Sequence, residues 1–140
     1  MARLATIEAV EARLKAAWSA SQWASTPVVG VLNPEARPAN GGAHLLVQYP
    51  ITNAEQISLG APGANVWRDV GVFSVLVHQP KAKFRLAIEQ ADAVAAIFRG
   101  RWFDGVQCWA PSGAEIDDRN DKALFFVMSV AVPYQADLVG

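Results

Sequence analysis

The chain has 140 residues, enough to bury one sizeable hydrophobic core, and we expect a single domain spanning residues 1–140. Its composition, 52% hydrophobic and 18% charged, excludes a disordered or low-complexity chain. The formal net charge of −1 argues against a general binder of nucleic acid or of anionic membranes, because such proteins usually carry a basic excess.

Targeting signals and disulfides are not indicated by the sequence. The single cysteine, Cys108, cannot form an intrachain disulfide or a cysteine-rich metal cage. The N-terminal stretch contains Glu8 and Glu11 and lacks the continuous apolar run of a signal peptide. No run approaches the ~18 apolar residues that suggest a transmembrane span. These features predict a soluble intracellular protein.

The N-terminal third predicts a helix followed by two strands. Thr6 is placed to cap a helix that ends near Ser19, and its apolar stripe is formed by Ile7, Val10, Leu14, Ala17 and Trp18. A short strand is predicted at 28–32, followed by a loop rich in Pro, Asn and Gly. The next predicted strand, 44–51, alternates, with Leu45, Val47, Tyr49 and Ile51 on its better-buried side. Residues 52–65 read as a long Gly- and Pro-bearing connection.

The remaining elements are a strand at 70–78, a helix at 84–98, a short strand or hairpin arm at 104–110 and a long terminal strand at 123–134. Phe84, Ile88, Ala91, Ala95 and Phe98 follow helical spacing, and Gly100 can adopt the left-handed conformation that ends a helix. The predicted fold is α+β, with the order α-β-β-β-α-β-β. A single mixed or antiparallel sheet would carry both helices mainly on one face.

Two predicted strands, 70–78 and 123–134, are apolar on both faces. Two helices can cover only one face of such a sheet, and exposed apolar patches usually mark interfaces. We therefore favour a partner chain over the second face. The alternative is a strongly curled sheet that buries this face against the chain's own long loops.

No catalytic, metal or cofactor set emerges from the sequence. His44 and His78 each lie on a predicted strand, where a lone histidine is usually a surface or hydrogen-bonded residue. Cys108 has no adjacent cation to stabilise a thiolate. Asp117, Asp118 and Asp121 lack the spacing of a calcium loop, and the cluster of Arg99, Arg101 and Trp102 is more typical of a helix end than of a nucleic-acid site. This absence favours an assembly or binding role over an enzyme.

Several short stretches occur in a recognisable order: TIEAVEARL, VVGVLNPEARP and HLLVQYPITNAEQISLG, and then FDGVQCWAP and a terminal strand ending in VPYQAD. With these stretches the chain resembles the tail terminators, or tail-completion proteins, of phages with long non-contractile tails. The most specific part of the resemblance is the segment 68–100, which begins RDVGVFSVLVHQP. The pattern covers nearly the whole chain in order but contains no catalytic signature.

This resemblance implies a non-enzymatic subunit of a homo-hexameric ring on the head-proximal end of a tail tube. Such a ring stops tube polymerisation and contacts the tail-tube protein and a head-tail connector or stopper protein. It implies location in the virion tail, with assembly in the host cytoplasm, and no cofactor, membrane or sequence-specific nucleic-acid partner. The expected subunit interface comprises Phe125, Val127, Phe73, Val75, Arg68 and Asp69. The alternatives are another neck or connector protein, or a small-ligand-binding domain that uses the Trp-rich loops and His78.

Overall fold

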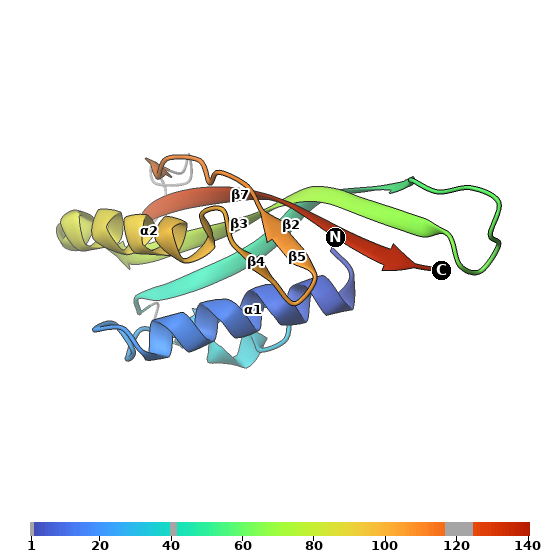
Figure 1. The fold of residues 1–140 in the computed structure, drawn as a ribbon. Coiled ribbons are helices and arrows are strands. Elements are labelled where there is room, and N and C mark those ends of the chain that lie inside the picture. The colour runs from blue at the N-terminus through green and yellow to red at the C-terminus, as the bar shows by residue number, and fades with distance from the viewer. Residues whose placement is uncertain (1, 40–41, 117–124) are drawn as a thin grey trace.

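The computed structural model describes residues 2–39, 42–116 and 125–140, with the side chain of Phe125 outside the described part. Two long helices, α1 (Leu4–Ser19) and α2 (Phe84–Phe98), accompany three long strands (Figure 1). The long strands are β2 (His44–Gln56), β3 (Val66–Pro80) and β7 (Phe125–Val139). The short elements are β1 (Val28–Val29), η1 (Pro34–Ala36), η2 (Lys81–Lys83), β4 (Trp102–Phe103), β5 (Val106–Cys108) and β6 (Glu115–Ile116).

The described strands belong to one mixed sheet with the order β1-β2-β3-β7-β5-β4, and β6 pairs with β7 beside β5. Among these strands only β1 and β2 pair in parallel, while the other pairs are antiparallel. The predicted α+β class and single mixed sheet are confirmed. The predicted order of elements lacked the short strands β4 and β6, whose two residues each give no periodic signal.

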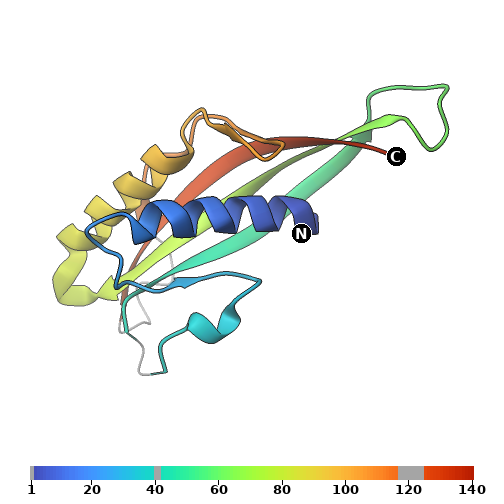
Figure 2. The ribbon, with the colours of Figure 1, turned by 60° about the horizontal axis from the view of Figure 1, so that its bottom comes forward.

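Both helices lie on the same face of the sheet, as predicted (Figure 2). The core forms between them and this face, because each helix turns one apolar stripe toward the strands. From α1 the stripe contains Ile7, Val10, Leu14 and Trp18, and from α2 it contains Ala87, Ala91, Val94 and Phe98. Phe73 at the centre of β3 meets the edge of the Phe98 ring at a centroid distance of 5.0 Å.

A bulge in β2 changes which face its side chains occupy. The pairing register with β3 shifts between Gln48 and Ile51, where Pro50 offers no N–H to the ladder. After the shift Ile51 pairs with Val72 and lies on the face opposite the helices. The prediction that Ile51 shares the buried side with Tyr49 is therefore wrong, because strict alternation cannot anticipate the extra residue.

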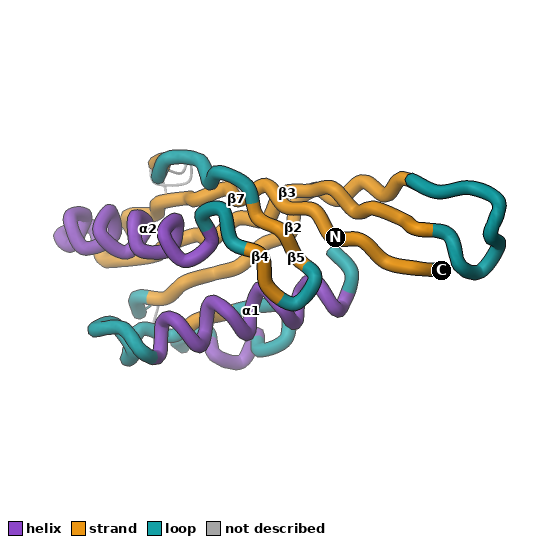
Figure 3. The backbone as a smooth tube through the Cα atoms, in the orientation of Figure 1, coloured by secondary structure: helices purple, strands orange, loops and turns teal. Residues whose placement is uncertain are grey.

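Strands β2, β3 and β7 continue beyond the helices as a three-stranded arm, formed by residues 51–72 and 133–140 (Figure 3). The connection predicted at 52–65 is thus shorter, because residues 52–56 belong to β2. The remaining tip loop, 57–65, is held by Asn65, whose side-chain oxygen accepts hydrogen bonds from the Ala61 N–H and the Ser58 hydroxyl. The backbones of Asn65 and Gly140 also exchange two hydrogen bonds, at 2.9 and 3.1 Å. The tip is therefore locally well supported.

The helix ends agree only partly with the sequence. Helix α1 begins at Leu4, so Arg3 occupies the cap position and the predicted cap residue, Thr6, lies buried inside the helix. Helix α2 has the predicted bounds. Gly100 adopts a φ of +62°, which confirms the left-handed residue expected after that helix.

Candidate functional site: an uncovered face of the sheet

The face of the sheet opposite the helices is assigned from the strand register, because paired residues in an antiparallel ladder point to the same side. We call this surface the outer face. Its central residues in the three long strands are Leu46, Gln48, Ile51, Asn53, Val70, Val72, Ser74, Leu76, Ser129, Ala131, Pro133 and Gln135. None of these twelve side chains is charged. The same register puts Glu55, Arg68 and Asp137 on this side at the arm end, and His44, His78 and Val127 on it at the other end.

The outer face contains apolar side chains that are open to solvent. Ile51 is 55% exposed and Val70 is 41% exposed, and Val72 between them is partly exposed. Trp102 pairs through Gln107 with Gln135 and extends the surface onto the β4–β5 hairpin, where its side chain is 79% exposed. At ~25 cal/mol per Å², such side chains gain several kcal/mol when a partner covers them. Within the described part of the chain, no helix lies over this face (Figure 2).

Polar and aromatic groups bound the outer face at its two ends. At the arm end, Arg68 Nε and Nη2 donate to the two carboxylate oxygens of Asp137, both at 2.8 Å. This bidentate pair holds the pKa of Asp137 below its ordinary value. At the other end, the rings of His44 and His78 stack with centroids 4.3 Å apart, and the neighbouring Val127 is buried.

The predicted interface residues Phe73 and Val75 do not lie on this face. Both are 0% exposed in the core under the helices, so their assignment to a subunit interface is wrong. The error arose because both sides of this strand are apolar and only the position of the helices decides which side is core. Val127 does belong to the outer side of β7 but is only 3% exposed. The side chain of Phe125 lies outside the described residues.

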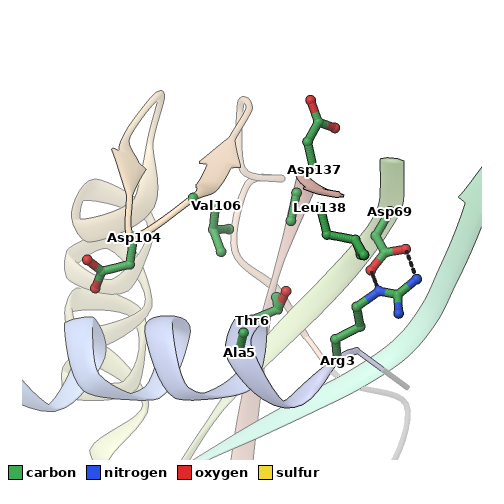
Figure 4. Close-up of a pocket in the computed structure, with 10 residues that line it drawn as sticks. Arg3, Ala5, Thr6, Asp69, Asp104, Val106, Asp137 and Leu138 are labelled. Atoms are coloured by element: carbon green, nitrogen blue, oxygen red, sulfur yellow. Dashed lines mark hydrogen bonds and ion pairs between the residues drawn. The ribbon is translucent and has the colours of Figure 1, made fainter. Parts of the chain in front are cut away.

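Arg68 and Asp69, also predicted at the interface, point to opposite sides of β3. Asp69 is 2% exposed and pairs with Arg3, whose Nη2 donates to Oδ1 at 3.2 Å and whose Nε donates to Oδ2 (Figure 4). This contact attaches the start of α1 to the arm. Asp69 is therefore already engaged within the subunit and is not available to a neighbour. The adjoining hollow of about 90 Å³ is well below the usual volume of a ligand pocket.

A buried carboxylate at Glu11 was not anticipated from the sequence. Glu11 is 2% exposed and accepts hydrogen bonds from the Tyr49 hydroxyl at 2.9 Å and from the backbone N–H groups of Val31 and Leu32. A Cβ at Gly30 would lie 1.9 Å from its Oε1, so the segment after β1 needs glycine there. These contacts join α1, β2 and the segment 30–32. They satisfy the carboxylate completely and indicate a structural role.

The other candidate chemical groups are also accounted for structurally. Burial raises the pKa of the Cys108 thiol to about 12, which disfavours the reactive thiolate. No group of His, Cys, Asp and Glu side chains suited to a metal ion occurs among the residues that the structure describes. Across those same residues, no helix has the length and hydropathy required to cross a membrane.

The tryptophans do not converge on one pocket. Trp18 stacks on Trp23 at a centroid distance of 5.3 Å beside the end of α1, whereas Trp67 donates from Nε1 to the Gly140 carbonyl in the arm. Trp102 lines an open hollow near Gln107, on yet another part of the molecule. This dispersal gives no support to a ligand site built from the Trp-rich loops.

Comparison with known proteins supports the fold and leaves the function open. No family model matches the chain, and a search of curated proteins found no match. The chain is similar to a solved structure whose recorded name states no function, with a TM-score of 0.62 and 21% sequence identity. The similarity covers 97% of this chain and 96% of the other. At this level of identity the likeness shows a shared fold alone.

Proposed function

We propose that this chain is a non-enzymatic tail terminator, which forms a ring on the head-proximal end of a phage or prophage tail tube. In this role it stops polymerisation of the tube and provides the surface to which the head attaches. The observation that carries the proposal is the exposed apolar surface of Ile51, Val70 and Val72 in the uncharged centre of the outer face. A subunit that closes a ring needs an apolar surface beyond its own core, and the order of elements in the chain resembles that of tail terminators.

The charge distribution supports an association surface over ordinary solvent-facing sheet. In the described long strands, the register places the charged side chains of Glu55, Arg68 and Asp137 together at the arm end of the outer face. The twelve central positions hold no charge, and Ile51, Val70 and Val72 among them expose apolar surface. Depletion of charge with retention of apolar side chains is typical of the centre of a protein–protein interface.

The proposal places the protein in the virion tail, after assembly in the host cytoplasm. Its partners are further copies of itself in a ring of six, the tail-tube protein below and a connector or stopper protein above. No cofactor, membrane or sequence-specific nucleic acid takes part. A different neck protein, such as a connector, would form a similar ring. The effect of the ring on tube length distinguishes the two, because a terminator shortens the tubes.

Tube assembly in vitro tests this role directly. The tail-tube protein from the same genome is polymerised with and without this chain, and tube lengths are measured by negative-stain electron microscopy. A terminator shortens the mean length in proportion to its concentration and appears as density at one tube end. Tubes of unchanged length with bare ends would refute the terminator role, and a ring that binds only a portal-side protein would identify a connector instead.

A further inference from the structure

Helix α2 carries a second exposed apolar surface. Phe84 is 50% exposed and Ile88, one helical turn later, is 40% exposed. Phe126 of β7 is partly exposed beside them, and its ring meets the Phe84 ring at a centroid distance of 6.3 Å and an interplanar angle of 66°. We call Phe84, Ile88 and Phe126 the α2 ridge. The sequence assigned Phe84 and Ile88 to the buried stripe together with Ala91, but in this part of the helix the core takes Ala87 and Ala91 and leaves Phe84 and Ile88 exposed.

The surroundings of the two apolar surfaces have opposite charge. Three exposed cations, Lys81, Lys83 and Arg85, lie within four residues of Phe84. Two exposed acids, Glu89 and Asp92, follow Ile88 on the same helix, so the surroundings of the ridge keep a small basic excess. The outer face is bordered by Glu55, opposite Arg68, and by Glu115, opposite Ser129, and both glutamates are exposed. Because Arg68 is neutralised by Asp137, the border of this face has an acidic excess. Opposite rims steer two surfaces together and fix their register.

The ridge and the outer face cannot meet within one chain. Helix α2 lies on the helical side of the sheet, and the outer face is the other side of the same strands (Figure 2). A contact between them therefore joins two copies. It is head-to-tail, because each copy uses one surface as donor and the other as acceptor, and contacts of this kind close into rings when the rotation allows.

We propose that the α2 ridge of one copy packs on the outer face of the next. This contact deepens the ring part of the proposed function and rests on it. It places a helix on the uncovered face, so a two-layer subunit becomes a three-layer arrangement at each contact. Phe84 and Ile88 lie over the centre of the face, where Ser74 and Ala131 are the smallest side chains, and Lys81, Lys83 and Arg85 approach Glu55 or Glu115.

The dimensions of the face fit this assignment. With strands about 4.8 Å apart and residues about 3.4 Å apart along each strand, the twelve residues cover roughly 15 by 20 Å. A helix is about 10 Å wide, so one helix and its flanking side chains occupy this width. A standard interface buries about 800 Å² of accessible surface per partner, which is more than the outer face and the α2 ridge cover. These two surfaces therefore form the apolar centre of the contact, and the charged residues around them form its margin.

Two single variants and their mixture test the contact. Ile51→Asp disables the outer face and Ile88→Asp disables the ridge, and both positions are exposed enough in the subunit to accept a charge. Leu59→Asp is the matched control, because Leu59 is 85% exposed at the arm tip and belongs to neither surface. Circular dichroism first establishes that each full-length variant is folded. Val70→Asp is the second variant of the outer face, and Phe84→Asp is the second variant of the α2 ridge.

Solution mass is then measured by light scattering over a wide range of protein concentration. We expect the unmodified chain and Leu59→Asp to form the same multimer, and Ile51→Asp and Ile88→Asp each to be monomeric. An equimolar mixture of the two variants should form dimers and nothing larger, because one intact ridge meets one intact face and both remaining surfaces are disabled. A two-fold symmetric arrangement of the same surfaces would stop at a dimer in the unmodified chain, so a multimer larger than a dimer is the result expected of the head-to-tail contact, and a dimer would refute it.

Other outcomes overturn the contact in distinguishable ways. If Ile88→Asp keeps the full multimer while Ile51→Asp loses it, the face binds some other surface of the neighbour, and the ring itself stands. If the mixture stays monomeric, the ridge and face do not meet. If the unmodified chain is monomeric at every concentration, the contact between copies is refuted. A multimer with the expected pattern that leaves tube length unchanged would instead refute the terminator role and retain the contact.

Discussion

Replacement of Glu11 by alanine tests whether the buried carboxylate organises this fold. The variant removes the acceptor for the Tyr49 hydroxyl and for the N–H groups of Val31 and Leu32. A buried donor left without an acceptor costs about 1–3 kcal/mol. Tyr49 is buried and incurs this penalty fully, whereas Val31 and Leu32 are 42% and 47% exposed, so water can replace part of their bonds. We therefore expect a loss of about 2–4 kcal/mol in the free energy of unfolding.

Urea unfolding followed by tryptophan fluorescence measures this loss, at one protein concentration so that any association is held constant. With an m value of about 1–3 kcal/mol/M, the midpoint should fall by about 1–2 M. Glu8→Ala is the matched control, since Glu8 lies exposed on the same helix, and we expect a change below about 0.5 kcal/mol. A double-mutant cycle with Tyr49→Phe should give a coupling of about 1 kcal/mol or more. If Glu11→Ala and Glu8→Ala have the same midpoint, the structural role assigned to Glu11 is refuted.

Three further changes have defined outcomes. Gly71→Ala should destabilise the subunit by more than about 2 kcal/mol, because the new Cβ would lie 2.2 Å from the Ile51 carbonyl oxygen; an unchanged urea midpoint would contradict this packing. Burial raises the pKa of both Tyr49 and Tyr134, so their contribution to stability is complete below the unfolded pKa of about 10 and is lost at higher pH. The urea midpoint should accordingly fall above pH 10, and Tyr49→Phe should reduce that fall. Cys108, with its pKa raised to about 12, should react with a thiol reagent at pH 8 only when the protein unfolds, and rapid reaction in the native state would refute its burial.

The sequence predicted the elements well where one pattern dominates. The period of α2 is unambiguous, and its predicted bounds match the structure. Strand β3 extends further than predicted, from Val66 to Pro80, because Arg68 and Asp69 interrupt the apolar pattern at its start. Each of these charged side chains has its own partner, Asp137 and Arg3 respectively, from distant parts of the chain. Pairing over such separations carries no local signal.

The candidate surface was foreseen in outline and misplaced in detail. The strands are apolar on both faces and the structure leaves apolar side chains exposed beyond the core, but Phe73 and Val75 were assigned to the interface because the pattern does not say which face the helices cover. The structure places these residues under the helices and leaves the outer face to smaller side chains and to Ile51, which the bulge at Pro50 redirects. Likewise, Glu11 on α1 looks like a solvated charge until β2 and the segment 30–32 surround it.

Subunits could also associate through the free edge of the sheet, but the residues at this edge disfavour the addition of another strand. Within the described residues, β1 pairs with β2 only at Leu45 and Leu46, so the rest of β2 is an edge. That edge contains Pro50, which lacks an N–H, a bulge that interrupts the ladder, and the exposed charge of Glu55. All three features are devices that prevent addition of another strand. The chain therefore protects this edge against strand addition, and the exposed apolar side chains of Ile51, Val70 and Val72 on the outer face are the more favourable surface for a neighbour.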